Sequence, residues 1–164
     1  MRLLMLLFCW CLLAIPAQAI TYHKDSITIE EVEKRVAFSV FKPKNLPKEW
    51  ELVIKTSPDI PKENVNDFRL QYFEKNDEIS ILVISQQDAS SVIHDYQSPS
   101  AKRITINGNE GYFSEWINSG EFDKNGRFIT GGVLDWIQDG TYIEMYSDFL
   151  TKEQMLDIAR SMKE

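Results

Sequence analysis

FITGGVLDWIQDGTYIEMYS, which spans residues 128–147, contains two runs of strand-forming residues around a short polar turn. Both runs are rich in β-branched and aromatic residues, and apolar and polar positions alternate, as in strands with one buried face. Gln138-Asp139-Gly140 between the runs is a turn signal. We therefore predict strands at about 128–137 and 141–147 that pair as an antiparallel hairpin.

The same pattern continues toward the N-terminus. Residues 79–84 are expected to form the second arm of another hairpin and are apolar on both faces. Ile79, Ile81 and Val83 should point one way, and Leu82 and Ile84 the other. Such a segment is typical of a central strand that is covered on two sides. Further strands are expected at 38–41, 50–54, 68–72, 103–106 and 112–117, with turns at 75–78, 107–111 and 123–126.

Two helices complete the predicted fold. Residues 28–31 have the S/T-x-x-E form of a capping box and predict a short helix over about 29–36. Thr151 and Gln154 predict a terminal helix, whose apolar stripe ends at Met162. Because consecutive hairpins pair antiparallel, the chain is expected to be an α+β domain. Its antiparallel meander sheet should have about seven or eight strands, with an N-terminal and a C-terminal helix packed on one face.

Residues 1–19 have the features of an export signal. A basic start precedes an uncharged apolar run of about 13 residues, and Ala17 and Ala19 are small residues of the kind that a signal peptidase reads. The run is shorter than the roughly 20 residues of a membrane-spanning helix, so no stable membrane insertion of the mature chain is expected. We predict cleavage between Ala19 and Ile20, which leaves a single extracytoplasmic domain at 20–164.

The composition of the mature chain excludes several classes of protein. Cys9 and Cys11 both lie in the signal, so no disulfide is expected. Loss of Arg2 leaves 17 basic against 25 acidic side chains, a formal charge of -8. A chain this acidic is repelled by phosphate, and we expect no nucleic acid among its partners.

Catalytic signatures are absent from the mature sequence. His23 and His94 lie in unrelated segments, and there is no serine-hydrolase elbow. Asp135 and Glu144 lie on strands that should pair, but exposed cross-strand positions explain them without any role in glycoside hydrolysis. We expect a protein that is not an enzyme and has no catalytic residues, no metal site and no cofactor.

Aromatic residues are the distinctive feature of the C-terminal half. Tyr112, Tyr142 and Tyr146 share their strands with polar residues, so they are the candidate binding surface and at least one should be substantially exposed. Trp116 and Trp136 are expected to be buried in the core.

The chain also resembles a known family. The segments that carry the resemblance are FKPKNLPKEWEL (41–52), LQY (70–72), INGNEGY (106–112), LDW (134–136) and the closing residues 150–162. These motifs are similar to those of the bacterial domain of unknown function numbered about 4367, and the similarity extends over nearly the whole mature chain. The resemblance implies an extracytoplasmic domain of the Gram-positive type, found alone behind a signal or as the outer part of a membrane protein, and it carries over no catalytic residues.

We therefore expect an exported, non-enzymatic domain of the cell envelope or secreted space that binds a protein or a cell-wall component through its sheet. The alternative is a carrier of an apolar ligand in a half-open barrel, and a more remote one is a carboxylate-based hydrolase. An unfilled apolar groove on the sheet would favour the carrier. A filled core with a flat aromatic patch would favour the binding module, and two carboxylates that face each other across a cleft would favour the hydrolase.

Overall fold

The structure is a computed structural model, and it describes residues 21–22, 26–57, 64–92, 100–116, 122, 126 and 129–164. The predicted signal at 1–19, the cleavage point between Ala19 and Ile20 and both histidines lie outside these residues. So do positions 123–125 of the predicted turn and the start of the strand predicted from residue 128.

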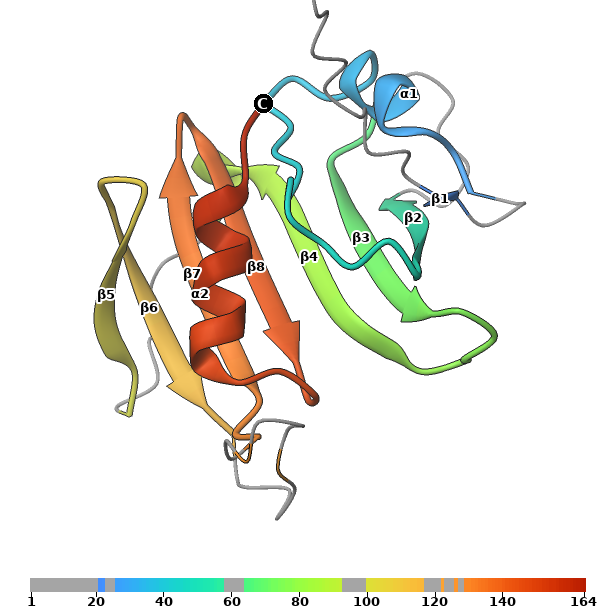
Figure 1. The fold of residues 1–164 in the computed structure, drawn as a ribbon. Coiled ribbons are helices and arrows are strands. Elements are labelled where there is room, and N and C mark those ends of the chain that lie inside the picture. The colour runs from blue at the N-terminus through green and yellow to red at the C-terminus, as the bar shows by residue number, and fades with distance from the viewer. Residues whose placement is uncertain are drawn as a thin grey trace, which may run out of the picture.

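Seven antiparallel strands form one sheet, and a two-residue strand adds to its edge in parallel (Figure 1). The strands are β1 (Thr21–Tyr22), β2 (Trp50–Ser57), β3 (Asp67–Glu74), β4 (Ser80–Asp88), β5 (Lys102–Ile106), β6 (Asn109–Glu115), β7 (Gly132–Gln138) and β8 (Thr141–Ser147). The helices are α1 (Ile29–Glu33), the 3-10 helix η1 (Ala89–Ser91) and α2 (Lys152–Ser161). The α+β class and the antiparallel sheet are therefore confirmed.

The strand order is β1-β2-β3-β4-β8-β7-β6-β5, which differs from the single meander that we predicted. One meander comprises β2 to β4. After β4 the chain crosses to the opposite edge, and a second meander from β5 to β8 returns until β8 pairs with β4. Asn107-Gly108 and Asp139-Gly140 are tight turns with positive φ at both residues. Such turns determine the pairing only of strands that are consecutive in the chain. The long-range β4–β8 pairing has no such local signal.

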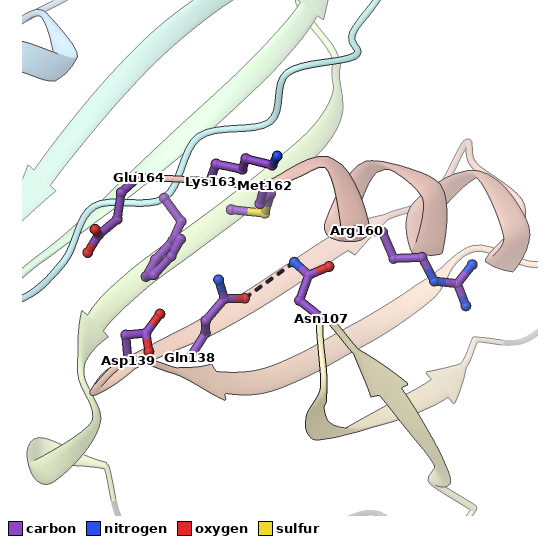
Figure 2. Close-up of a pocket in the computed structure, with 8 residues that line it drawn as sticks. Asn107, Gln138, Asp139, Arg160, Met162, Lys163 and Glu164 are labelled. Carbon is purple, nitrogen blue, oxygen red and sulfur yellow. Dashed lines mark hydrogen bonds between the residues drawn. The ribbon is translucent and has the colours of Figure 1, made fainter.

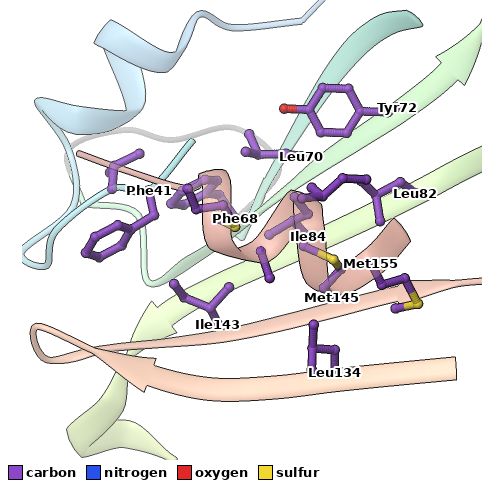
Figure 3. Close-up of a cluster of buried hydrophobic side chains, with 14 of the residues drawn as sticks. Phe41, Phe68, Leu70, Tyr72, Leu82, Ile84, Leu134, Ile143, Met145 and Met155 are labelled. Atoms are coloured by element: carbon purple, nitrogen blue, oxygen red, sulfur yellow. The ribbon is translucent and has the colours of Figure 1, made fainter. Parts of the chain in front are cut away.

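Helix α2 lies across one face of the sheet and encloses the core (Figures 1 and 3). As predicted, Thr151 and Gln154 form a capping box: each side-chain oxygen accepts from the other residue's backbone N–H, at 3.3 and 2.8 Å. Leu150 and Met155, on either side of the cap, are both buried. The side chains labelled in Figure 3 are Phe41, Phe68, Leu70, Tyr72, Leu82, Ile84, Leu134, Ile143, Met145 and Met155.

Helix α1 is shorter than predicted, although its capping box between Thr28 and Glu31 is present. Its buried residues Ile29 and Val32 belong to the same core cluster as those of α2. The helix lies at an end of the sheet near β3, while α2 lies over β7 and β8 (Figure 1). A backbone hydrogen bond of 2.9 Å from Val65 N to Arg35 O ties the segment after α1 to the start of β3.

The strand that we predicted at 38–41 does not form. A side chain takes the place of a neighbouring strand there: Gln86 on β4 accepts from Phe41 N at 2.8 Å and donates to Phe41 O at 2.7 Å. Gln86 is completely buried. Its amide group satisfies both backbone groups of Phe41, so this segment stays in the core without joining the sheet.

Strand β4 is central, as predicted, but its faces are not those that we assigned. The pairing with β3 slips between Tyr72 and Phe73, and Ile81 joins the core cluster together with Leu82. Ile79 lies before the strand and is exposed. Val83 is buried outside that cluster, opposite Tyr146. An irregularity of this kind shifts side chains relative to the simple alternation that the sequence suggests.

Candidate functional site

The second face of the sheet carries the tyrosines that we predicted as a binding surface. On β8, Ile143 and Met145 belong to the core, so the alternating residues Tyr142, Glu144 and Tyr146 lie on the opposite face. Among the described residues, no helix covers this face (Figure 1). We call the face formed by the following six residues the tyrosine face: Tyr112, Trp116, Asp135, Tyr142, Glu144 and Tyr146.

Strand pairing brings all three predicted tyrosines into one patch. Glu144 lies between Tyr142 and Tyr146 along β8, and its partner on β7 is Asp135. Asp135 in turn lies opposite Tyr112 on β6. Directly opposed residues have Cβ atoms about 4.5–5.5 Å apart, so the patch is continuous over three strands.

The exposure of these aromatic side chains differs from the prediction. All three tyrosines are partly buried, and none is substantially exposed. Trp136 is 2% exposed, as predicted, whereas Trp116 is 40% exposed. Trp116 lies just beyond the end of β6 and stacks on Tyr146, with ring centroids 6.1 Å apart and an angle of 27°. The expected burial of Trp116 was wrong because it follows the strand and extends the tyrosine face.

Two carboxylates act on Tyr142 at the centre of the patch. Burial of the Tyr142 side chain raises its pKa above the ordinary value, and the charges of Asp135 and Glu144 raise it further. Hydrogen bonding to Glu144 acts in the same direction. The hydroxyl of Tyr142 therefore stays protonated and serves as a hydrogen-bond donor.

The edge of the patch forms its own polar network. Tyr112 donates its hydroxyl hydrogen to Glu110 Oε1 at 2.7 Å, and Arg103 pairs with Glu110 Oε2 at 3.2 Å. Both charged side chains are well exposed, so their ion pair contributes little to stability. Its effect here is to hold the Arg103 guanidinium beside Glu110.

The geometry of Asp135 and Glu144 does not resemble a glycosidase cleft. The prediction that their strands pair is confirmed, since the two residues are direct partners. They stand side by side on one face of the sheet, however, and do not face each other across a cleft. Neither residue lines any of the three cavities described next.

A cavity of about 300 Å³ lies where α2 ends above the β5–β6 and β7–β8 turns (Figure 2). Asn107 Nδ2 donates to Gln138 Oε1 at 3.5 Å across its floor. Two basic and two acidic side chains line the cavity, so no net charge selects a ligand there. Its remaining lining residues are Phe41, Asp139, Arg160, Met162, Lys163 and Glu164.

Two further cavities have linings that mix apolar side chains with carboxylates. One of about 510 Å³ lies beside the β3–β4 turn, and the other, of about 500 Å³, lies between the segment after α1 and the β7–β8 turn. The first is lined by Glu51, Val53, Phe73, Asn76, Asp77 and Glu78. The second is lined by Val36, Ala37, Phe38, Ser39, Asp88, Asp139 and Gly140.

In the part of the chain that the structure describes, no group of three or more His, Cys, Asp or Glu side chains is arranged to hold a metal ion. Within the same residues, no helix has the length and apolar character needed to cross a membrane.

Fold and site together define an α+β domain with one helix-covered sheet face and one face of tyrosines and carboxylates. The chain belongs to the family of the domain of unknown function DUF4367, whose model matches residues 40–162. The match begins before β2 and ends at Met162, so it includes the whole tyrosine face. Searches of curated proteins and of solved structures found no significant match. The suspected family is therefore confirmed.

Proposed function

We propose that this chain is an exported, non-enzymatic domain of the cell envelope or secreted space, and that it binds a protein or a cell-wall component through the tyrosine face. The observation that carries the proposal is the gathering of three tyrosines and an exposed tryptophan on one face of the sheet. Tyrosine and tryptophan offer large contact areas with few rotatable bonds, and they are enriched at binding surfaces.

The filled core supports a binding surface over a carrier cavity. The face of the sheet under α2 is packed with side chains such as Leu134 and Met145, both fully buried. An apolar-ligand carrier needs an unfilled apolar groove, whereas each of the three cavities described above has at least two carboxylate side chains in its lining. The tyrosine face is partly exposed and none of its residues lines these cavities, so it fits contact with a large partner better than enclosure of a small one.

The proposed export rests on the sequence of residues 1–19, and the charge of the domain is compatible with export. A domain with a formal charge of -8 after loss of the signal repels other acidic surfaces unless a specific contact is made. Aromatic side chains on the tyrosine face would supply such a contact.

Site-specific photocrosslinking tests the proposal. The full chain is produced in its own host with benzoylphenylalanine at the position of Trp116 or, in a control, at that of Glu153. Glu153 is exposed on α2, on the other side of the sheet. We expect a discrete crosslinked product in the envelope or secreted fraction from the first position and none from the second. Equal crosslinking from both positions, or none from Trp116, would contradict the proposal.

A further inference from the structure

We propose that the cavity at the end of α2 binds a short, extended peptide of three residues with free amino and carboxyl ends. The cavity has a volume of about 300 Å³, at the lower end of the range for small-ligand sites, and we call it the α2-end cavity. None of the residues that line it belongs to the tyrosine face, so this site goes beyond the proposed function. The peptide's ammonium would lie at Asp139 and Glu164, and its carboxylate at Arg160.

The charged side chains of the α2-end cavity are separated in space. Figure 2 shows Asp139 and Glu164 at one end and Arg160 at the other, while Lys163 points away from Glu164 toward α2. The Arg160 side chain is 53% exposed, and its only printed ion pair is with Asp157, at 3.6 Å on the same helix. Such an exposed pair is weak, so a ligand carboxylate can replace Asp157. The charges cancel in sum but not in position, which suits a ligand with opposite charges at its two ends.

Two side-chain amides lie between the charged ends, and the indole of Trp136 orients them. Gln138 Oε1 accepts from Trp136 Nε1 at 3.4 Å and from Asn107 Nδ2 at 3.5 Å. Gln138 Nε2 therefore points into the cavity, and Asn107 Oδ1 points toward Arg160 (Figure 2). Within the described part of the chain, neither of these two atoms makes a hydrogen bond. From the carboxylates toward Arg160, a ligand thus meets first a donor and then an acceptor.

The order of these groups selects a peptide of three residues. In an extended chain the N–H and C=O of one residue point to the same side, and those of the next residue point to the other. One side of a tripeptide therefore carries, in order, the ammonium, the first C=O, the third N–H and the carboxylate. The α2-end cavity presents their complements in the same order: two carboxylates, Gln138 Nε2, Asn107 Oδ1 and Arg160. A dipeptide does not match, because the C=O and N–H of its single trans amide point in opposite directions.

Isothermal titration calorimetry of the full chain with trialanine tests the proposal. N-acetyl-trialanine lacks the ammonium, and trialanine amide lacks the carboxylate. Each should bind about tenfold more weakly than trialanine, because each loses the charge-assisted hydrogen bonds at one end. No measurable binding at millimolar trialanine, or equal binding of all three peptides, overturns the inference.

The variant Arg160→Gln tests where the carboxylate lies. It should weaken binding of trialanine about tenfold and leave binding of trialanine amide unchanged, because only trialanine has a carboxylate for the guanidinium. A general loss of structure would weaken both peptides alike, so the comparison isolates the contact. Unchanged binding of trialanine by Arg160→Gln contradicts the inference.

Asn107→Gly, compared with Asn76→Gly, tests the amide contact without disturbing a turn. The two asparagines have φ of 51° and 66°, a backbone conformation that glycine adopts readily, so both turns should be retained. Of the two, only Asn107 lines the α2-end cavity. We expect about a fivefold loss of trialanine affinity for Asn107→Gly and less than about twofold for Asn76→Gly. Equal affinities overturn the inference.

The outcome is independent of the proposed function. Neither asparagine variant should alter crosslinking from the position of Trp116, because the α2-end cavity and the tyrosine face share no residue. Loss of peptide binding with crosslinking retained therefore concerns the cavity alone. Absence of crosslinking from the unaltered chain contradicts the proposed function and leaves the peptide measurements to decide this inference.

Discussion

Replacing Gln86 by leucine should destabilise the protein strongly, because the glutamine side chain makes the two backbone hydrogen bonds that a neighbouring strand would otherwise make. Its amide satisfies both the N–H and the C=O of Phe41, at 2.8 and 2.7 Å. Gln86 is completely buried and Phe41 is 2% exposed, so water cannot replace either bond. A leucine of similar volume would leave two buried backbone groups without partners.

The size of the effect follows from these two groups. Leaving one buried donor or acceptor unsatisfied costs about 1–3 kcal/mol. Two such groups, offset in part by the more favourable burial of leucine, give an expected loss of about 2–5 kcal/mol in the free energy of unfolding. This is a large share of the 5–15 kcal/mol that stabilises a typical domain.

Urea unfolding measures the loss, and the adjacent residue provides a matched control. Gln87 is on the same strand, but its side chain is partly buried on the other face, and its replacement by leucine should change stability by no more than about 0.5 kcal/mol. If Gln86→Leu unfolds within about 1 kcal/mol of the original chain, the reasoning about Phe41 is refuted.

Gln86→Glu adds a pH test of the same contact. A protonated carboxyl can donate to Phe41 O and accept from Phe41 N, as the amide does, whereas a carboxylate can only accept. The introduced carboxyl should therefore have a raised pKa in the folded state. The stability that it contributes is present below the unfolded-state pKa of about 4.3 and is lost as the pH rises through the folded-state value. A variant equally stable at about pH 4 and pH 7 would contradict this.

Three further predictions follow. Trp136→Ala should lower the free energy of unfolding by about 3–5 kcal/mol and Trp116→Ala by less than about 1 kcal/mol, since only Trp136 is fully buried. Similar melting temperatures for both variants would be inconsistent with this core. Because the pKa of Tyr142 is raised, stability should be constant below about pH 10 and fall as the pH rises beyond it, and ultraviolet titration should show one tyrosine that ionises after the others. N-terminal sequencing of exported protein should begin at Ile20; an intact Met1 in the membrane fraction would disprove export by cleavage.

Local signals predicted most of the elements of this fold. The bounds predicted for β8 coincide with Thr141–Ser147, and both capping boxes form as the spacing of Thr28–Glu31 and Thr151–Gln154 indicates. Each of these features depends on residues within one turn of helix or one hairpin. Such interactions can be derived from the sequence because the groups that satisfy one another are near neighbours in the chain.

The errors share a different cause, which is dependence on distant partners. We predicted this strand only over 79–84, yet β4 continues to Asp88. Gln86 is buried there because its amide group bonds to the backbone of Phe41, which lies 45 residues away in the chain. The strand order reverses after β4 because β8 pairs there, and no local pattern encodes that choice.

The candidate site shows the same division. Alternation along the strands placed Tyr112, Tyr142 and Tyr146 on one face, and the pairing of Asp135 with Glu144 was also foreseen. The position of Trp116 was not, because its contact with Tyr146 depends on how the chain leaves β6. We predicted a strand over 112–117 that includes Trp116, whereas β6 ends at Glu115, and no local pattern marks that earlier end.

The most direct test of the tyrosine face is a binding measurement with the host's own envelope fraction. Binding of the variant Trp116→Ala/Tyr146→Ala is compared with that of Leu156→Ala/Glu153→Ala on α2, after circular dichroism has shown that both are folded. We predict that the first variant loses binding and the second retains it. Full binding by the folded Trp116→Ala/Tyr146→Ala variant would show that the tyrosine face is only a scaffold and that the site lies elsewhere.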